Sequence, residues 1–92
     1  MPQEIVDNQA QSRYELAIDG AVAFIEYRRS PGVITFVHAE VPPKLGGRGI
    51  GSSLARAVLE AARANGDKVI AQCSFVAAFI SKNPEFQDLL AT

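Results

Sequence analysis

A short segment in the middle of the chain is rich in glycine. It comprises Gly46, Gly47, Arg48, Gly49, Ile50, Gly51 and Ser52. A strand-like pattern precedes the segment and a helix-like pattern follows it, so backbone N–H groups and the positive end of a helix dipole meet there. Glycine lets the backbone approach a ligand and lets successive N–H groups converge on one oxygen. The segment therefore predicts a phosphate-binding loop; the alternative is a strand-to-helix turn that binds nothing.

Two common nucleotide-binding motifs do not match this segment. A P-loop carries a lysine followed by Ser or Thr after its last glycine, whereas Ser52 and Ser53 follow Gly51 here. The dinucleotide fingerprint requires a third glycine three residues after the second. Counted from Gly47 and Gly49, that place is taken by Ser52, and the next strand lacks the expected acidic residue. ATP and NAD are therefore poor candidates for the ligand.

Three side chains could move protons or attack a carbonyl near this loop. Cys73 closes a predicted strand just before a predicted helix, where the helix dipole stabilises a thiolate, so it is a candidate nucleophile or acid. His38 and Glu40 lie two residues apart on one strand face, close to the loop, and either is a candidate base. The structural alternatives are an inert buried thiol, a solvated Glu40 and a histidine packed against Phe36.

The elements that must position these residues begin with three strands. Alternating apolar residues predict strands over residues 13–18, 21–28 and 33–41. Tight turns are expected at Asp19-Gly20 and at Ser30-Pro31-Gly32. On the third strand, Ile34, Phe36, His38 and Glu40 are expected to share one face. Because both faces of that strand are mostly apolar, we expect both to be covered.

The pattern changes to helical spacing after the glycine segment. A helix is predicted over residues 52–65 and stops at Asn65-Gly66. A short strand over residues 68–73 follows, then a second helix that Ser74 could cap and that Pro84 must end. The predicted fold class is α+β: an antiparallel three-stranded meander followed by helix, strand and helix, with the helices packed on the sheet.

The composition fits one folded domain, which we expect to span residues 1–92. Hydrophobic residues make up 48% of the chain and charged residues 21%, which excludes a disordered or repetitive protein. The net charge of −1 provides no basic field for nucleic acid. One cysteine and one histidine are too few for a structural metal site. Without a signal-peptide pattern or a run of roughly 20 apolar residues, the chain is expected to be cytoplasmic and to bind no membrane.

The glycine segment resembles the acyl-CoA loop of the GNAT superfamily of N-acetyltransferases. That loop reads Arg or Gln, two variable residues, Gly, one variable residue, then Gly or Ala; Gly46 stands here where Arg or Gln is usual. The resemblance continues through Glu40-Val41-Pro42-Pro43, Gln72-Cys73-Ser74-Phe75-Val76 and Asn83-Pro84-Glu85-Phe86. These segments look like the small single-domain branch of the superfamily, and the resemblance covers the chain from Tyr14 onward.

The resemblance implies a minimal GNAT-like acyl-CoA N-acyltransferase fold with acetyl-CoA as co-substrate. Coenzyme A would bind the glycine segment from Gly46 to Ser52, with its pyrophosphate on Gly47 to Gly51 and the helix N-terminus at Ser52. The backbone of Val41 would face the pantetheine arm. That arm would lie in a slot where the third and fourth predicted strands splay apart. Cys73 would lie near the cofactor thiol, either accepting the acetyl group or protonating the thiolate. Glu40 or His38 would take a proton from an amine acceptor.

The sequence thus predicts an N-acetyltransferase that transfers acetyl from acetyl-CoA to an amine, either on a small molecule or on a protein. The alternative is a coenzyme A-binding module without catalysis, acting as a sensor or partner subunit, because the loop would bind the cofactor with or without a base. A third interpretation is an interaction domain whose glycine segment is only a turn.

Overall fold

The computed structural model describes residues 5–45 and 49–91. Its strands are β1 (Ile5–Asn8), β2 (Arg13–Ile18), β3 (Ala21–Ser30), β4 (Val33–Glu40) and β5 (Lys68–Ala71). Its α-helices are α1 (Ile50–Asn65) and α2 (Ser74–Lys82), and its 3-10 helices are η1 (Pro43–Leu45) and η2 (Pro84–Leu89). The predicted α+β class and element order are confirmed, with β1 as an additional first strand.

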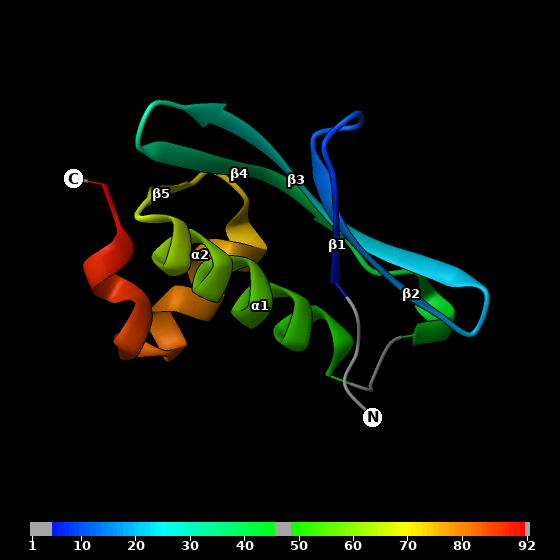
Figure 1. The fold of residues 1–92 in the computed structure, drawn as a ribbon. Helices are drawn as coiled ribbons and strands as arrows, with labels where there is room; N and C mark the ends of the chain where they lie inside the picture. The colour runs from blue at the N-terminus through cyan, green and yellow to red at the C-terminus, as the bar shows by residue number, and fades with distance from the viewer. Residues whose placement is uncertain (1–4, 46–48, 92) are drawn as a thin grey trace.

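The strands form one sheet in the order β1-β2-β3-β4-β5 (Figure 1). The first four strands are antiparallel neighbours. The predicted turn between β2 and β3 has positive φ at both Asp19 and Gly20, 53° and 78°, which suits the twist of a two-residue hairpin. By contrast, β5 pairs with β4 in parallel. A parallel neighbour needs a long crossover, and α1 supplies it.

The core lies on one face of the sheet, under the helices. Alternate side chains of β2, β3 and β4 meet a stripe of buried residues on α1, among them Leu54, Val58 and Leu59. Figure 1 shows both α-helices and η2 beneath the sheet. In the described part of the chain no helix covers the other face, where Val22 and Ile70 are about two-fifths exposed. The prediction that both faces of β4 are covered is therefore wrong.

The helix ends follow local backbone chemistry. The α1 helix begins at Ile50, two residues before the predicted start, because the Ser53 N–H already donates to the Gly49 carbonyl at 3.0 Å. It ends at Asn65 as predicted, with Gly66 in the left-handed region. The prediction that Ser74 caps the second helix is wrong. The cap position belongs to Cys73, whose carbonyl accepts the Ala77 N–H at 3.0 Å.

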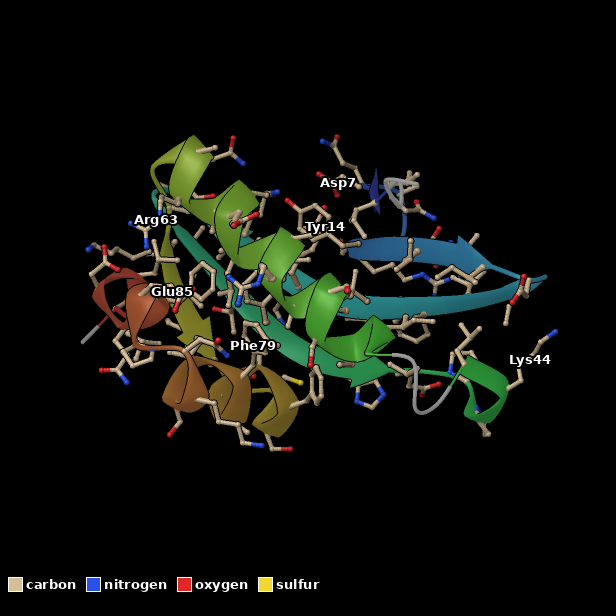
Figure 2. The ribbon with its side chains drawn as sticks, turned by 90° about the horizontal axis from the view of Figure 1, so that it is seen from below. Asp7, Tyr14, Lys44, Arg63, Phe79 and Glu85 are labelled. Carbon is tan, nitrogen blue, oxygen red and sulfur yellow. The ribbon has the colours of Figure 1, made fainter. Side chains whose placement is uncertain are left out.

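Two arginines of α1 attach the C-terminal segment to the helix layer. Arg56 donates to Glu85 at 3.0 Å, and Arg63 binds both carboxylate oxygens of Asp88 at 2.9 and 3.0 Å. Arg63 also donates to the Glu85 carbonyl at 2.7 Å, and Figure 2 shows these two residues side by side where α1 meets η2. Hydrogen bonds from the arginines hold the pKa of the Glu85 and Asp88 carboxyl groups below their ordinary values.

Candidate active site

An extra residue interrupts the pairing of β3 with β4. Tyr27 of β3 lies opposite Phe36 of β4, but the preceding residue, Glu26, lies opposite His38. Val37 is therefore a β-bulge, a residue of β4 with no partner on β3. A bulge of one residue reverses which side chains point to which face of the sheet. The two halves of β4 consequently present their even-numbered residues to opposite faces.

The bulge places His38 and Glu40 on the face of the sheet away from the helices. The prediction that they share the face of Ile34 and Phe36 is wrong, because the alternation on which it rests is broken at Val37. The two side chains do lie together, with His38 Nε2 3.0 Å from Glu40 Oε2. Both side chains are more than half exposed. His38 packs beside the ring of Phe24, with 6.3 Å between the ring centroids, and not against Phe36. They form an accessible pair on the open face.

Beyond the bulge, one edge of β4 carries no strand. β5 pairs with β4 only from Val33 to Phe36. The last link between the two segments is the Cys73 N–H, which donates to the Phe36 carbonyl at 2.9 Å, after which the chain turns into α2. Within the described residues, the part of β4 from 37 to 40, here called the free edge, has no partner on that side. The pairing of the two strands stops here because β5 ends at Ala71, and the predicted slot between them stays a prediction.

The N-terminus of α1 lies just beyond the end of the free edge along the chain. Gly49 is its cap residue, in the left-handed region with φ of 69°, and it makes no side-chain cap bond. The first turn of α1 holds no acidic residue, so its own side chains do not offset the positive end of the dipole. The first N–H groups of a helix have no helical carbonyl to bind. Ser52 is exposed beside them, while Gly46, Gly47 and Arg48 lie outside the described residues.

The predicted cofactor residues Val41, Ile50 and Gly51 lie at the junction of β4 with α1. Ile50 is buried at the start of the helix. A Cβ atom on Gly51 would lie 2.8 Å from Cζ of Phe75 and 3.4 Å from Cγ2 of Val41. A side chain at position 51 would therefore require the Phe75 ring of α2 to shift. The end of β4 and the first turns of both helices converge at this point.

Cys73 lies at the inner end of the free edge. Its backbone is held against Phe36, one residue before the bulge, and its side chain is 6% exposed within the core cluster. The structure thus places Cys73 next to the strand position that precedes the bulge. His38 and Glu40 follow the bulge, on the face of the sheet away from the helices. Cys73 is a buried free cysteine, which also agrees with the alternative that it is an inert thiol.

A separate cavity of about 360 Å³ lies between α2, η2 and the end of β5. Its lining is Ala71, Ala77, Ile80, Ser81, Gln87 and Leu90. These side chains carry no charge for a phosphate, and none of the candidate catalytic residues is among them. Across residues 5–45 and 49–91, no group of three His, Cys, Asp or Glu side chains could hold a metal ion. The same ranges contain no helix that is both long and apolar enough to cross a membrane.

Two features of the site are missing from the sequence analysis. The bulge at Val37 does leave a signal that the predicted alternation does not take into account: the apolar residues shift from even positions (Ile34, Phe36) to odd ones (Val37, Ala39), and His38 is polar. Phe75 has helical spacing with Phe79, which suggests a core position, yet it is 40% exposed. The signal that could have singled it out is the glycine at position 51, but only the fold brings the two together.

Comparisons with known proteins point to one family. The sequence model described as GCN5-related N-acetyl-transferase matches residues 13–89. Among solved structures, the chain is similar to a GCN5-like candidate N-acetyltransferase from Staphylococcus aureus, studied by NMR in solution. The two are 35% identical, the match covers 97% of this chain and 88% of the other, and the TM-score is 0.75. The chain therefore belongs to the GCN5-related N-acetyltransferases and is an enzyme of that class, as its resemblance to the GNAT superfamily predicts.

Proposed function

We propose that this enzyme transfers the acetyl group of acetyl-CoA to an amine, with residues 1–92 acting as one catalytic domain. The observation that carries this proposal is that the free edge of β4 is followed along the chain by a helix N-terminus whose first turn holds no acidic residue and whose cap makes no side-chain bond. Unpaired strand groups can hydrogen-bond the amide-containing pantetheine arm, and a helix N-terminus can bind a pyrophosphate.

The proposed cofactor path uses the residues that the sequence singles out. The pyrophosphate binds the N–H groups from Gly49 to Ser52, with Gly46, Gly47 and Arg48 completing the loop. The pantetheine arm then follows the free edge, where the Val41 backbone faces it. The thioester carbonyl comes to rest near the bulge, between Cys73 on one side and the His38–Glu40 pair on the other. No metal ion takes part in this proposal.

The proposed chemistry is direct transfer. The His38–Glu40 pair takes a proton from the amine, whose nitrogen attacks the thioester carbonyl. The new C–N bond forms, the C–S bond breaks, and the coenzyme A thiolate receives a proton from the Cys73 thiol. The pair then releases the amine's proton to water and Cys73 regains a proton from water, so both groups return to their starting states. Exposure of the His38–Glu40 pair supports this proposal, because an amine can reach it from the open face of the sheet.

The test is calorimetric titration with coenzyme A and with acetyl-CoA. In the Gly49→Asp variant an added carboxylate should repel the pyrophosphate, so we expect saturable binding to wild type and loss of binding in this variant. The matched control is Gly32→Asp, because Gly32 has a similar positive φ of 73° and equally open space but lies in the β3–β4 turn. Equal loss in both variants, or no binding to folded wild type, would contradict the proposal.

Binding without turnover would favour the non-catalytic module instead. Acetyl-CoA consumption measured across a panel of amines separates that outcome from catalysis.

A further inference from the structure

The ring of Phe75 occupies a position that neither core packing nor helix propensity requires. Phe75 is the second residue of α2 and is 40% exposed, whereas Val76 beside it is fully buried. Its ring lies against Gly51 of α1, and the Val41 side chain lies against the same point. Large apolar side chains that remain exposed beside a binding groove are common contact residues for ligands.

The ring therefore stands beside the path proposed for the cofactor. Val41 follows the free edge of β4, and Gly51 belongs to the helix N-terminus proposed for the pyrophosphate. A ligand joining the two must pass the junction that Phe75 shares with both residues. The exposed part of the ring offers apolar surface to the carbon chain of such a ligand, and the buried part fixes its orientation.

We propose that Phe75 is a binding residue for the pantetheine arm of coenzyme A and that Gly51 is a positioning residue for its ring. The inference rests on the proposed function, since it assumes that the cofactor follows the free edge of β4. In this proposal Gly51 makes room for the Phe75 ring, and the backbone N–H groups at the start of α1 bind the pyrophosphate.

The test compares two probes by calorimetry: coenzyme A, and 3′-phospho-ADP, the nucleotide half that lacks the pantetheine arm. In Phe75→Ala we expect the Kd of coenzyme A to rise about tenfold, which corresponds to about 1.4 kcal/mol. The Kd of 3′-phospho-ADP should stay unchanged, because that probe does not reach the ring. Ile70→Ala is the matched control, since Ile70 is 41% exposed but lies on β5 facing away from the helices; it should change neither Kd.

Gly51→Ala provides a second, independent variant. Its methyl group would displace the Phe75 ring, so it should weaken coenzyme A binding in the wild-type background and have no further effect once Phe75 is alanine. Phe75→Leu should restore part of the affinity.

The inference is overturned if Phe75→Ala binds coenzyme A as tightly as wild type does, an outcome that leaves the proposed function intact. It is overturned also if both probes weaken equally, because the ring would then act on the nucleotide end or on the fold. If folded wild type binds neither probe, the proposed function fails and this inference fails with it.

Discussion

Gly51 and Phe75 should be energetically coupled in folding, and the coupling can be measured without any ligand. The perturbation is Gly51→Ala, made once in the wild type and once in Phe75→Ala. In the wild type the new Cβ would lie 2.8 Å from the ring Cζ, closer than two such atoms can approach, so the ring must shift. In the second background the ring is absent, and the nearest remaining contact, 3.4 Å to Val41, needs only a slight adjustment.

The magnitude follows from two opposing effects. Gly51 has no positive φ and lies within α1, so replacing it by alanine should stabilise the helix by about 0.5–1 kcal/mol. Full burial of a Phe side chain contributes about 1.5–3 kcal/mol. Because Phe75 is 40% exposed, a shift that exposed all of its buried three-fifths would cost about 1–2 kcal/mol, which is the upper bound of the effect. Gly51→Ala should therefore destabilise the wild type by as much as about 1.5 kcal/mol and stabilise Phe75→Ala by about 0.5–1 kcal/mol.

The assay is urea and thermal unfolding of all four proteins, followed by circular dichroism. A coupling of 1 kcal/mol corresponds to about 4–8 °C in Tm for a domain of this size, which is easily resolved. The reasoning would be refuted if Gly51→Ala changed stability by the same amount and sign in both backgrounds. That result would mean that the ring does not depend on the missing side chain.

Three further outcomes follow from the site and from the C-terminal segment. Glu40→Gln should lower kcat about 100-fold and, like His38→Ala, alter the rising limb of the pH–rate profile; unchanged profiles in both variants would exclude the pair as base. Cys73→Ala should lower kcat while leaving the Kd of coenzyme A unchanged, and mass spectrometry should detect no acetyl-cysteine in wild type; detection of that adduct would contradict direct transfer. The pKa of Asp88 is lowered in the folded state by the hydrogen bond from Arg63, so this carboxylate stabilises the fold above its ordinary value of 3.8 and ceases to do so as pH falls below it. The urea midpoint should therefore fall in acid, and less so in Arg63→Gln; an equal fall in both proteins would contradict this assignment.

Local chemistry made much of the fold predictable. Asp19-Gly20 determines a hairpin because both residues adopt positive φ, and Gly66 ends α1 for the same backbone reason. The helical spacing from Leu54 to Ala62 matches the buried face of α1. Such signals depend on neighbours in the sequence, so they can be interpreted without knowing what packs against them.

The features that were missed depend on neighbours that are distant in the sequence. The bulge at Val37 is defined by its pairing with β3; the shift of apolar residues from even to odd positions there is compatible with a bulge, but equally with a strand that is apolar on both faces. The short strand β1 becomes a strand because it pairs with β2, although its own pattern is mixed. The role of Gly51 depends on a ring 24 positions later in the chain, a separation obtained from the two residue numbers.

The glycine segment contains both kinds of feature, those set by sequence neighbours and those set by distant residues. Its sequence predicted a ligand-binding loop, and all of its glycines were assigned one purpose. In the structure Gly49 caps a helix with a left-handed backbone, whereas Gly51 accommodates an aromatic ring. Residues of one type within a single motif therefore serve different physical needs, which spacing alone does not separate.

The central claim is that coenzyme A lies along the free edge of β4 and ends at the N-terminus of α1. The most direct measurement is an NMR titration of the ¹⁵N-labelled protein with coenzyme A, following every backbone amide. The account predicts that the largest shifts fall on residues 37–41, 49–52 and 73–75. Shifts concentrated instead on the cavity between α2 and η2, around Ser81 and Gln87, would contradict it, as would the absence of any shift at saturating cofactor.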